Sequence, residues 1–438
     1  MATPVYKAPR GLRDVLPEQM GAWRWLESTA HELARRFGYR EIRPPLLEET
    51  ELFARSVGEV TDIVEKEMFT VRKAEHSFTL RPEGTAGTVR AYLEAGYAKT
   101  APFQKLFYLG PMFRYEKPQK GRERQFTQFG IECIGSLDPR LDAEAVLLAV
   151  SFFRELGLGG LEVRLNSMGD GADRDAFREA VRAHVEPNLA RYSEESQRRF
   201  ERNVLRILDS KDPRDIELNQ GAPRLVDHLG DENRAHFDRV LALLDEAGVD
   251  AVVDPTIVRG LDYYTRTVFE VHCPSIGARS ALCGGGRYDH LVEELGGPDL
   301  GAVGFAIGFT ATLAALGDAG LLEGRDEAPA DCFVASADDA THDAAFAVAC
   351  ELRAAGVSAV FDQEARRLKG QLKLASKAGH PLVAVVGSAE LADGTVQLKD
   401  MSSKEQETVP RAELVGRARA RLAATGVSAA DGSSSAGA

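Results

Sequence analysis

The residues best placed to do chemistry lie in a β-hairpin that the sequence predicts around residue 114. Arg114 follows an apolar strand, KLFYLGPMF, and the polar loop after it adds Lys117, Lys120, Arg122 and Arg124. Cations at a strand end and in the adjoining loop suit a polyphosphate, because one guanidinium can donate to two phosphate oxygens. A solvated hairpin with ordinary surface charge is the alternative, and the hairpin taken alone favours it.

The strand that returns from this loop carries Gln128 and Glu132, four residues apart. Because successive side chains of a strand alternate between its two faces, both of these point to the same face. An amide and a carboxylate on one face could hold an amino group.

Two later segments combine a cation with aromatic or glycine residues. In VRGLDYYTRTVFEV, Arg259 interrupts an apolar run and is followed by Asp262, Tyr263 and Tyr264. A cation in such a run either forms a structural ion pair or faces a ligand. In CGGGRYD, three glycines precede Arg287. This segment has neither the GKS or GKT ending of a P-loop nor the G-x-G-x-x-G spacing, and we expect a tight turn there.

The stretch from Leu300 to Gly317 carries no charge, yet it is interrupted by several glycines, including Gly304 and Gly308. We expect a buried strand, a glycine turn and the start of a buried helix rather than a membrane span. Glycines four residues apart suggest a close backbone approach to a planar ligand, or tight internal packing, and the packing interpretation is favoured.

The composition points to a globular protein without a resident metal. The chain has 438 residues, 44% of them hydrophobic and 28% charged, and its formal net charge is -13. An acidic chain must contact RNA through local basic patches, if at all. The five cysteines form no C-x-x-C pair, so we expect no zinc or dithiol site, and their scarcity suits a reducing cytoplasm. The N-terminus lacks the apolar core of a signal peptide.

The elements that must position these residues can be predicted from periodicity. Apolar residues recur at helical spacing over residues 17–37, with Gly38 as the stop, and Pro44 and Pro45 then exclude a helix interior. Short β-like runs follow, and residues 141–156 fit a helix. Residues 169–247, rich in Arg, Glu, Asp and Ala, fit a helical insertion. We therefore predict that the strands before and after the insertion share one antiparallel sheet.

The C-terminal part alternates strands and helices after a polar, proline-containing linker at residues 324–331. Strands are expected at DCFVAS, VSAVFD, PLVAVVG, TVQLKD and QETVP, with helices at Thr341–Ala355, Arg367–Ala378 and Arg411–Ala424. This rhythm predicts a compact α/β domain over residues 330–424. The Ser-, Ala- and Gly-rich tail, residues 425–438, is expected to be disordered.

In this order, the segments resemble the histidyl-tRNA synthetases, a family of class II aminoacyl-tRNA synthetases, over about residues 9–424. The resemblance is carried by RPEGTAGTVRAYL, LGPMFRYEKPQKGRERQFTQFGIECIG, VRGLDYYTRTVFEV, SALCGGGRYD and GAVGFAIG. It implies an α+β fold: a class II antiparallel sheet flanked by helices, with a helical insertion, forming a catalytic core over residues 1–324. It also implies that the C-terminal α/β domain binds the anticodon.

The resemblance also implies roles for single residues. Arg114 and Arg259 would be catalytic: Arg114 would contact the ATP α-phosphate and the substrate carboxylate, and Arg259 would stabilise charge on the α-phosphate. Arg122 would contact the outer phosphates. Histidine would be held by eight residues: Glu83, Gly84, Thr85, Gln128, Glu132, Tyr263, Tyr264 and Tyr288.

The implied activity is that of a cytoplasmic histidine–tRNA ligase. It would activate L-histidine with ATP, accompanied by Mg²⁺, to give histidyl-adenylate and pyrophosphate, and would then transfer histidine to tRNA(His). The family is dimeric, and the segment around Pro44 and Pro45 would lie near the dimer interface. The sequence does not specify which tRNA bases are read or how the insertion acts.

One position departs from the family pattern. The third class II motif normally ends in a Glu-Arg pair, and this chain has Thr310 and Ala311 there. The arginine expected to contact the ATP γ-phosphate is therefore absent. Two further hypotheses are a weakened paralogue that serves as the regulatory subunit of ATP phosphoribosyltransferase and an RNA-binding or histidine sensor without chemistry. The intact RGLDYY and GGGRYD segments and the C-terminal domain favour the enzyme.

Overall fold

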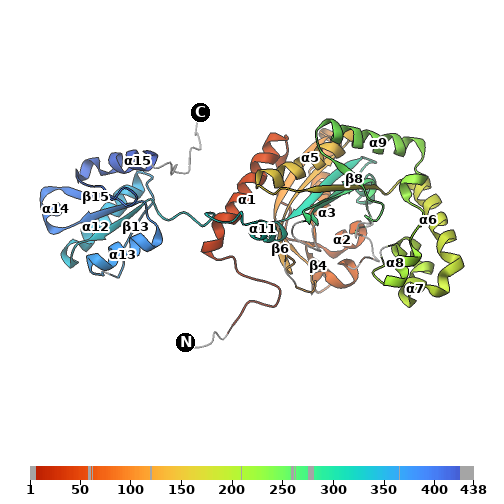
Figure 1. Ribbon diagram of the computed structural model, residues 1–438, viewed down its shortest axis with the longest axis horizontal. Coiled ribbons are helices and arrows are strands. Elements are labelled where there is room, and N and C mark those ends of the chain that lie inside the picture. Colours follow the sequence, from red (N-terminus) through yellow and green to blue (C-terminus); the bar gives the residue numbers. More distant parts are fainter. Residues whose placement is uncertain are drawn as a thin grey trace. The chain divides into compact units, whose positions relative to one another are not determined.

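The computed structural model describes residues 6–57, 61, 63–118, 121–208, 210–257, 261, 263–274, 281–364 and 366–424. The chain forms two compact units, Met1–Asp326 and Glu327–Ala438 (Figure 1). The tail expected at residues 425–438 lies outside the described residues.

The N-terminal unit is built on an eight-stranded sheet in the order β1-β5-β6-β11-β10-β9-β7-β8. Its two outer pairs, β1 with β5 and β7 with β8, are parallel, and the pairs between them are antiparallel. The sheet therefore unites strands from before and after the insertion, as predicted. The strands are β1 (Arg40–Glu41), β5 (Gln104–Phe113), β6 (Gln125–Ile134), β7 (Glu162–Ser167), β8 (Ala251–Val253), β9 (Thr265–His272), β10 (Ala281–Arg287) and β11 (Ala302–Gly308).

Helices cover one face of this sheet. They are α1 (Pro17–Arg36), α5 (Pro139–Glu155), α9 (Asp231–Glu246) and α11 (Phe309–Asp318). Their apolar side chains pack in one buried cluster with Phe129, Ile131 and Cys133 of β6 and with Phe305 of β11. Because strand side chains alternate, this packing leaves the even-numbered residues of β6 on the opposite face.

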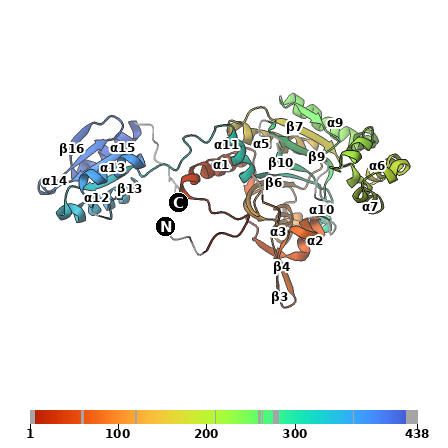
Figure 2. The same cartoon turned by 60° about the horizontal axis from the view of Figure 1, so that its bottom comes forward.

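That opposite face carries a second cluster, which includes Val89, Tyr92, Tyr263, Tyr288 and Leu291. Two of its buried residues come from α3 (Thr85–Glu94) and two from α10 (Leu291–Glu294). A separate three-stranded sheet has the order β2-β4-β3, and Figure 2 shows its hairpin of β3 and β4 projecting from the unit. The smaller elements here are β2 (Leu47–Glu49), α2 (Thr50–Val57), a π-helix (Ile63–Glu67), β3 (Phe69–Lys73), β4 (His76–Leu80) and α4 (Tyr97–Thr100).

The prediction of a tight turn at the three glycines before Arg287 was wrong. Gly284, Gly285 and Gly286 lie inside β10, between β9 and β11. A Cβ atom on Gly285 would lie 2.5 Å from the carbonyl oxygen of Gly304 and 2.7 Å from the ring of Phe269. The glycines therefore permit close packing within a continuous strand.

The helical segment between β7 and β8 has its own small core. Phe177, Val181, Phe200, Ile207 and Leu225 are buried together in it. Figure 1 shows α6, α7 and α8 gathered at one end of the unit. They span α6 (Gly171–Val185), α7 (Glu194–Arg202) and α8 (Pro213–Leu218), whereas α9 packs against α5 in the main core.

The C-terminal unit has a five-stranded sheet in the order β13-β12-β14-β15-β16, with the predicted alternation of strands and helices. Residues of α12 and α15 pack on one side of the sheet and residues of α13 on the other. One short helix, α14, was not predicted. The elements are β12 (Cys332–Ser336), α12 (His342–Ala354), β13 (Ala359–Phe361), α13 (Leu368–Ala378), β14 (Leu382–Val386), α14 (Ser388–Asp393), β15 (Thr395–Asp400), β16 (Gln406–Pro410) and α15 (Leu414–Ala424).

The uncharged stretch from Leu300 to Gly317 forms β11 and most of α11, as predicted. Among the described residues, no helix has the length and apolar character that crossing a bilayer requires.

Candidate functional site

Glu83 lies directly before α3 and is anchored to the first turn of that helix. One of its carboxylate oxygens accepts the backbone N–H of Thr85 at 2.6 Å, and the other accepts that of Ala86 at 2.9 Å. The side chain is buried. Burial raises the pKa of Glu83, while these two N–H groups and the nearby Arg114 act against the rise. The helix start thus holds a carboxylate in a fixed orientation inside the protein.

Glu132 lies on β6, on the sheet face that the helices leave open. Its Oε1 accepts the Thr85 hydroxyl at 2.8 Å, and its Oε2 accepts the hydroxyl of Tyr288. Only 1% of the residue is exposed. Burial, with a contribution from Glu83, raises the pKa of Glu132 to about 8, although the hydrogen bonds oppose the rise. A cation that enters the site would favour the ionised form of both carboxyl groups.

Gln128 shares this face of β6 and has an unused acceptor. The residue is 8% exposed, and its side-chain Oε1 is buried without a hydrogen-bond partner among the described residues. A buried polar atom without a partner is rare in a native protein and calls for a donor. An ammonium group between Gln128 and the two glutamates would supply one.

Three tyrosines form an aromatic wall of the same site. The ring centroids of Tyr263 and Tyr264 are 4.8 Å apart, and those of Tyr263 and Tyr288 are 5.5 Å apart with the planes nearly perpendicular. All three side chains are buried. They present both ring surfaces and hydroxyl groups to a ligand, which suits a flat, polar ring.

Tyr108 of β5 belongs to the site and was not predicted. A Cβ atom on Gly84 would lie 2.2 Å from the ring of Tyr108, and one on Gly130 would lie 2.3 Å from it. The ring is therefore held between two glycines, close to Glu132 and Thr85. Burial and the two glutamates raise the pKa of Tyr108 well above its ordinary value, so its hydroxyl stays protonated. A large aromatic directly across from Gly130 in the hairpin register is the signal that sequence reasoning missed.

Gly304 has a role that the sequence left open. It pairs with Glu132 across β11 and β6, and a Cβ atom on it would lie 2.2 Å from Oε2 of that glutamate. This Cβ atom would lie equally close, at 2.2 Å, to the backbone carbonyl oxygen of Ile131, so this glycine permits both tight packing of the two strands and the position of the Glu132 carboxylate.

Of the three predicted arginines, Arg114 is the one that the structure places beside the pocket. It follows the last residue of β5, its Nε donates to the carbonyl of Pro82 at 2.8 Å, and its charge opposes the rise that burial causes in the pKa of Glu83. Arg122 is 59% exposed and bonds to Glu116 at 3.0 Å, in a loop whose residues 119 and 120 are not described. Arg259 lies outside the described residues, as does Asp262.

Arg287 is structural rather than part of the pocket. It is fully buried and donates to both oxygens of Asp142, to Asp289 and to the carbonyl of Ser136. Although burial raises the pKa of Asp142, Arg287 and His236 outweigh this and lower it to about 2. This ion pair fixes the end of β10, from which Tyr288 reaches Glu132.

Thr310 and Ala311 form the first turn of α11. Thr310 lines a cavity of about 460 Å³ together with Trp23, Arg13 and Glu123. The Nε of Arg13 lies 2.6 Å from Oε1 of Glu123, so this cation is already paired. Neither Thr310 nor Ala311 adds a charge to this side of the unit.

The arrangement can bind a zwitterion with a polar ring. Two carboxyl groups and an amide oxygen suit its ammonium group, tyrosines suit the ring, and Arg114 lies where its carboxylate or a phosphate would enter.

Comparisons with known proteins agree with this geometry. The family described as Histidyl-tRNA synthetase matches residues 11–312, and the family described as Anticodon binding domain matches residues 331–421. The Histidine--tRNA ligase of Thermosynechococcus vestitus is 46% identical over 410 residues, covering 93% of this chain and 95% of that protein. The Histidine--tRNA ligase of Bacillus cytotoxicus is 47% identical over 405 residues, covering 92% and 96%. The solved apo histidyl-tRNA synthetase of S. aureus superposes with a TM-score of 0.80 at 37% identity, covering 94% and 99%.

Proposed function

The chain belongs to the histidyl-tRNA synthetase family, and from this premise we propose that it is the ligase that joins L-histidine to tRNA(His) at the expense of ATP. The observation that carries the proposal is the buried set of Glu83, Gln128 and Glu132, which combines two neighbouring carboxyl groups with an amide oxygen that has no donor among the described residues. Histidine can supply such donors, because its ammonium group and its imidazole ring both carry N–H groups.

We assign the histidine-binding roles as follows. The ammonium group lies among Glu83, Gln128 and Thr85, where it donates to oxygens that the fold already orients. The imidazole lies against Tyr263, Tyr264 and Tyr288, with Glu132 as its charged partner; Gly84 admits the ring of Tyr108 behind them. This assignment explains why the pocket keeps two carboxyl groups close together despite their repulsion.

We assign the ATP side to three arginines. Arg114 orients the histidine carboxylate and the α-phosphate, since it lies between the pocket and the loop of the hairpin. Arg259 neutralises charge on the α-phosphate, and Arg122 binds the outer phosphates. ATP enters as its Mg²⁺ complex, so the metal is part of the substrate.

The chemistry then consists of positioning and electrostatics. The histidine carboxylate attacks the α-phosphorus in line, pyrophosphate leaves, and histidyl-adenylate remains. A terminal ribose hydroxyl of the tRNA next attacks the activated carbonyl and releases AMP. Fixed arginines stabilise the charge that develops at the phosphorus without reorganising.

The test is histidine-dependent exchange between ATP and pyrophosphate, run against all twenty amino acids, followed by charging of tRNA(His). We expect exchange with histidine alone. Absence of exchange with pure protein and Mg²⁺, together with no charging, would refute the ligase function. The regulatory-subunit alternative is not favoured, because relatives that match almost the whole chain bear the ligase name and the anticodon-binding domain is present.

We also propose a cytoplasmic homodimer whose interface includes the surface that follows Pro44 and Pro45. Leu46 and Leu47 are 43% and 49% exposed there, which is unusual for two adjacent leucines on a solvated surface. Light scattering after size exclusion should give a dimer mass, and Leu47→Asp should shift the protein toward the monomer. A wild-type monomer would contradict the proposal.

A further inference from the structure

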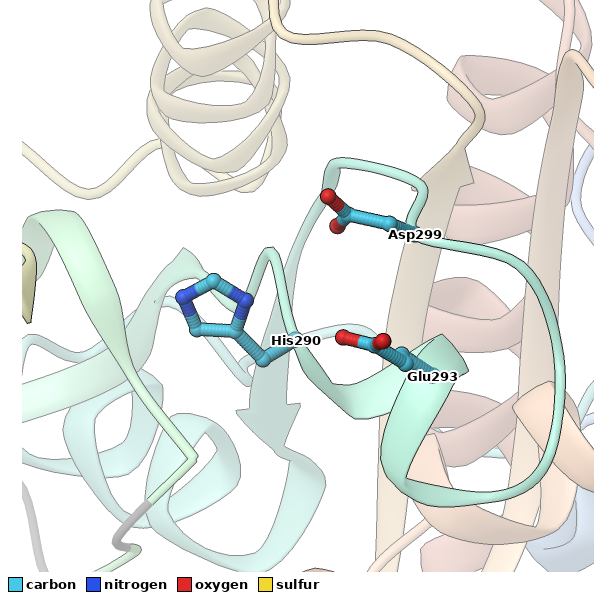
Figure 3. Close-up of side chains that lie close together, drawn as sticks. All are labelled: His290, Glu293 and Asp299. Carbon is cyan, nitrogen blue, oxygen red and sulfur yellow. The ribbon is translucent and has the colours of Figure 1, made fainter.

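A group of side chains outside the histidine pocket has the composition of a metal site. His290, Glu293 and Asp299 each offer one ligand atom, and these atoms lie within 4.8 Å of one another. Figure 3 shows the three side chains turned toward one small space, with one imidazole nitrogen facing the carboxylates and the other facing away. His290 directly precedes α10, Glu293 lies on α10, and Asp299 lies in the loop that follows it.

A carboxylate on the side of the His290 imidazole that faces away from the cluster sets the orientation of the ring. Its Nε2 lies 3.4 Å from Oδ1 of Asp170, at the start of the helical insertion. A neutral imidazole that donates its Nε2–H to a carboxylate leaves the lone pair of Nδ1 directed at Glu293 and Asp299. A histidine that binds a metal in a protein almost always donates its other ring N–H to an acceptor, which is a carboxylate, a backbone carbonyl or water.

The backbone around the cluster is held in place. Leu291 and Val292 are fully buried, and the N–H of Gly297 donates to the carbonyl of Val292 at 2.9 Å. A Cβ atom on Gly297 would lie 2.5 Å from the side chain of Leu93, so the loop is pressed against α3. The three ligand side chains are exposed and can close around an ion without moving this backbone.

Local charge also favours a cation. The chain has no Lys or Arg between Arg287 and Arg325, whereas Glu293, Glu294 and Asp299 all lie in that stretch. The basic side chain recorded beside the cluster is Arg266, whose Nη2 is 3.9 Å from Asp170 and which also pairs with Glu232.

From these observations we propose that His290, Glu293 and Asp299 bind one divalent first-row transition-metal ion such as Zn²⁺, with Asp170 as a positioning residue. One imidazole and two carboxylates form a ligand set that these ions accept, and the remaining coordination positions would hold water. The cysteine spacing gave no sign of the site because it uses no thiolate. The inference is independent of the proposed ligase activity, although the ion would lie two residues beyond Tyr288.

The test is titration of the full, metal-free chain with Zn²⁺ by calorimetry, without histidine in the buffer. The background carries Cys350→Ser, because Cys350 is an exposed thiol that would bind zinc by itself. We expect one equivalent to bind and the melting temperature to rise, as it must when a ligand binds the folded state. His290→Gln, Glu293→Gln and Asp299→Asn should each weaken binding roughly tenfold or more, and Asp170→Asn about tenfold.

Two matched variants separate this site from general surface binding. His76→Gln removes another exposed imidazole, and Glu323→Gln removes another exposed carboxylate. Both should bind zinc as the parent does. The proposal is overturned if the parent fails to bind one equivalent, or if His290→Gln binds no worse than His76→Gln. Melting curves without metal establish that each variant is folded.

Discussion

Glu132 is a carboxyl group that the fold removes from water and surrounds with hydroxyl donors and a second carboxyl group. Its environment favours the neutral form until a cation arrives. Histidine binding would therefore be coupled to loss of a proton from the protein. This coupling is measurable without any assay of catalysis.

The stability of the chain should depend on pH through Glu132. The pKa of its carboxyl group rises from 4.5 to about 8 on folding. Because the folded protein holds this proton more tightly than the unfolded chain, the carboxyl group contributes its full stability below about pH 4.5. This contribution is lost as the pH rises through about 8. Glu132→Gln should therefore gain stability relative to the parent between pH 5 and pH 8, by on the order of 3 kcal/mol at most.

Urea unfolding of both proteins at several pH values, in the absence of histidine, measures this difference. Glu323→Gln is the control, because it neutralises an exposed carboxylate and should show no such trend. Parallel stability curves for the parent and Glu132→Gln would show that the carboxyl group titrates normally in the folded protein.

Ala311 is at the position where the resemblance to the family led us to expect an arginine. Ala311→Arg should lower the KM for ATP by about tenfold, since a charge-assisted hydrogen bond contributes roughly 1.5–3 kcal/mol. The new side chain would start beside the hairpin loop. A Cβ atom built on Gly121 of that loop would lie 3.7 Å from the Cα atom of Ala311. Steady-state exchange at saturating histidine gives the value, and Ala311→Gln controls for size. An unchanged or higher KM would mean that another group, such as Arg13, already fills the role.

At the scale of elements, the site depends on the way that side chains alternate between the two faces of β6 and β11. Odd-numbered residues of β6 enter the main core, so Gln128, Gly130 and Glu132 must face the pocket. The two-residue period of a strand was enough to predict that Gln128 and Glu132 share a face. The pairing of β6 with β11 was not predictable, because β11 follows the whole helical insertion in the chain. Tyr108 lies on β5, inside the predicted hairpin, and was missed because the prediction did not include the hairpin register that places it opposite Gly130.

Glycine-rich segments were the least predictable elements. A run of three glycines is typical of a turn, yet in β10 it serves to bring two neighbouring strands and Phe269 close together. Local preference cannot separate these outcomes, since glycine tolerates both. The start of the first helix was predicted at residue 17, whereas α5 begins at Pro139, two residues before the predicted start, and α8 was not predicted as a separate helix. Each of the three helices has proline at its first position.

Gly304→Ala should impair histidine binding by displacing Glu132. The new methyl group would lie 2.2 Å from Oε2 of Glu132 and 2.2 Å from the backbone carbonyl oxygen of Ile131. The carboxylate would therefore have to leave its bonds to Tyr288 and Thr85, and β6 would have to shift with it. We expect the KM for histidine to rise at least tenfold, which corresponds to loss of about 1.4 kcal/mol. Gly308→Ala, on the same strand, is the control, because its nearest contact is an ordinary 4.0 Å. Equal KM values for the two variants would contradict the placement of Glu132.

At the scale of the whole molecule, the chain consists of two units with separate hydrophobic cores. Residues 332–422 supply the two clusters of the C-terminal unit, and the remaining clusters lie between Trp23 and Leu322. The second unit could be predicted from the alternation of strands and helices, because each element shows its own local pattern of apolar residues. The short helix α14 was missed, since six residues give too little periodicity.

Because the two units have separate cores, we predict that the activation of histidine can be separated from its transfer to tRNA by removing the second unit. A chain that ends at Asp326 keeps every described residue of the histidine pocket and keeps Arg325 stacked 3.7 Å above Trp25. It should retain histidine-dependent exchange of ATP and pyrophosphate, because both small substrates bind in the first unit. Charging of tRNA(His) should fall roughly 100-fold or more in kcat/KM, because a second, covalently linked binding module is lost.

Exchange by the truncated chain serves as its own control for folding, and melting curves confirm that its core is intact. Charging that survives truncation unchanged would mean that the first unit alone recognises the tRNA, and the insertion of α6, α7 and α8 would become the element to test. Loss of exchange from a chain that still melts cooperatively would instead show that the C-terminal unit supports the histidine site. The first outcome concerns recognition of the tRNA and the second concerns binding of the small substrates, so measuring both activities separates the two contributions of the C-terminal unit.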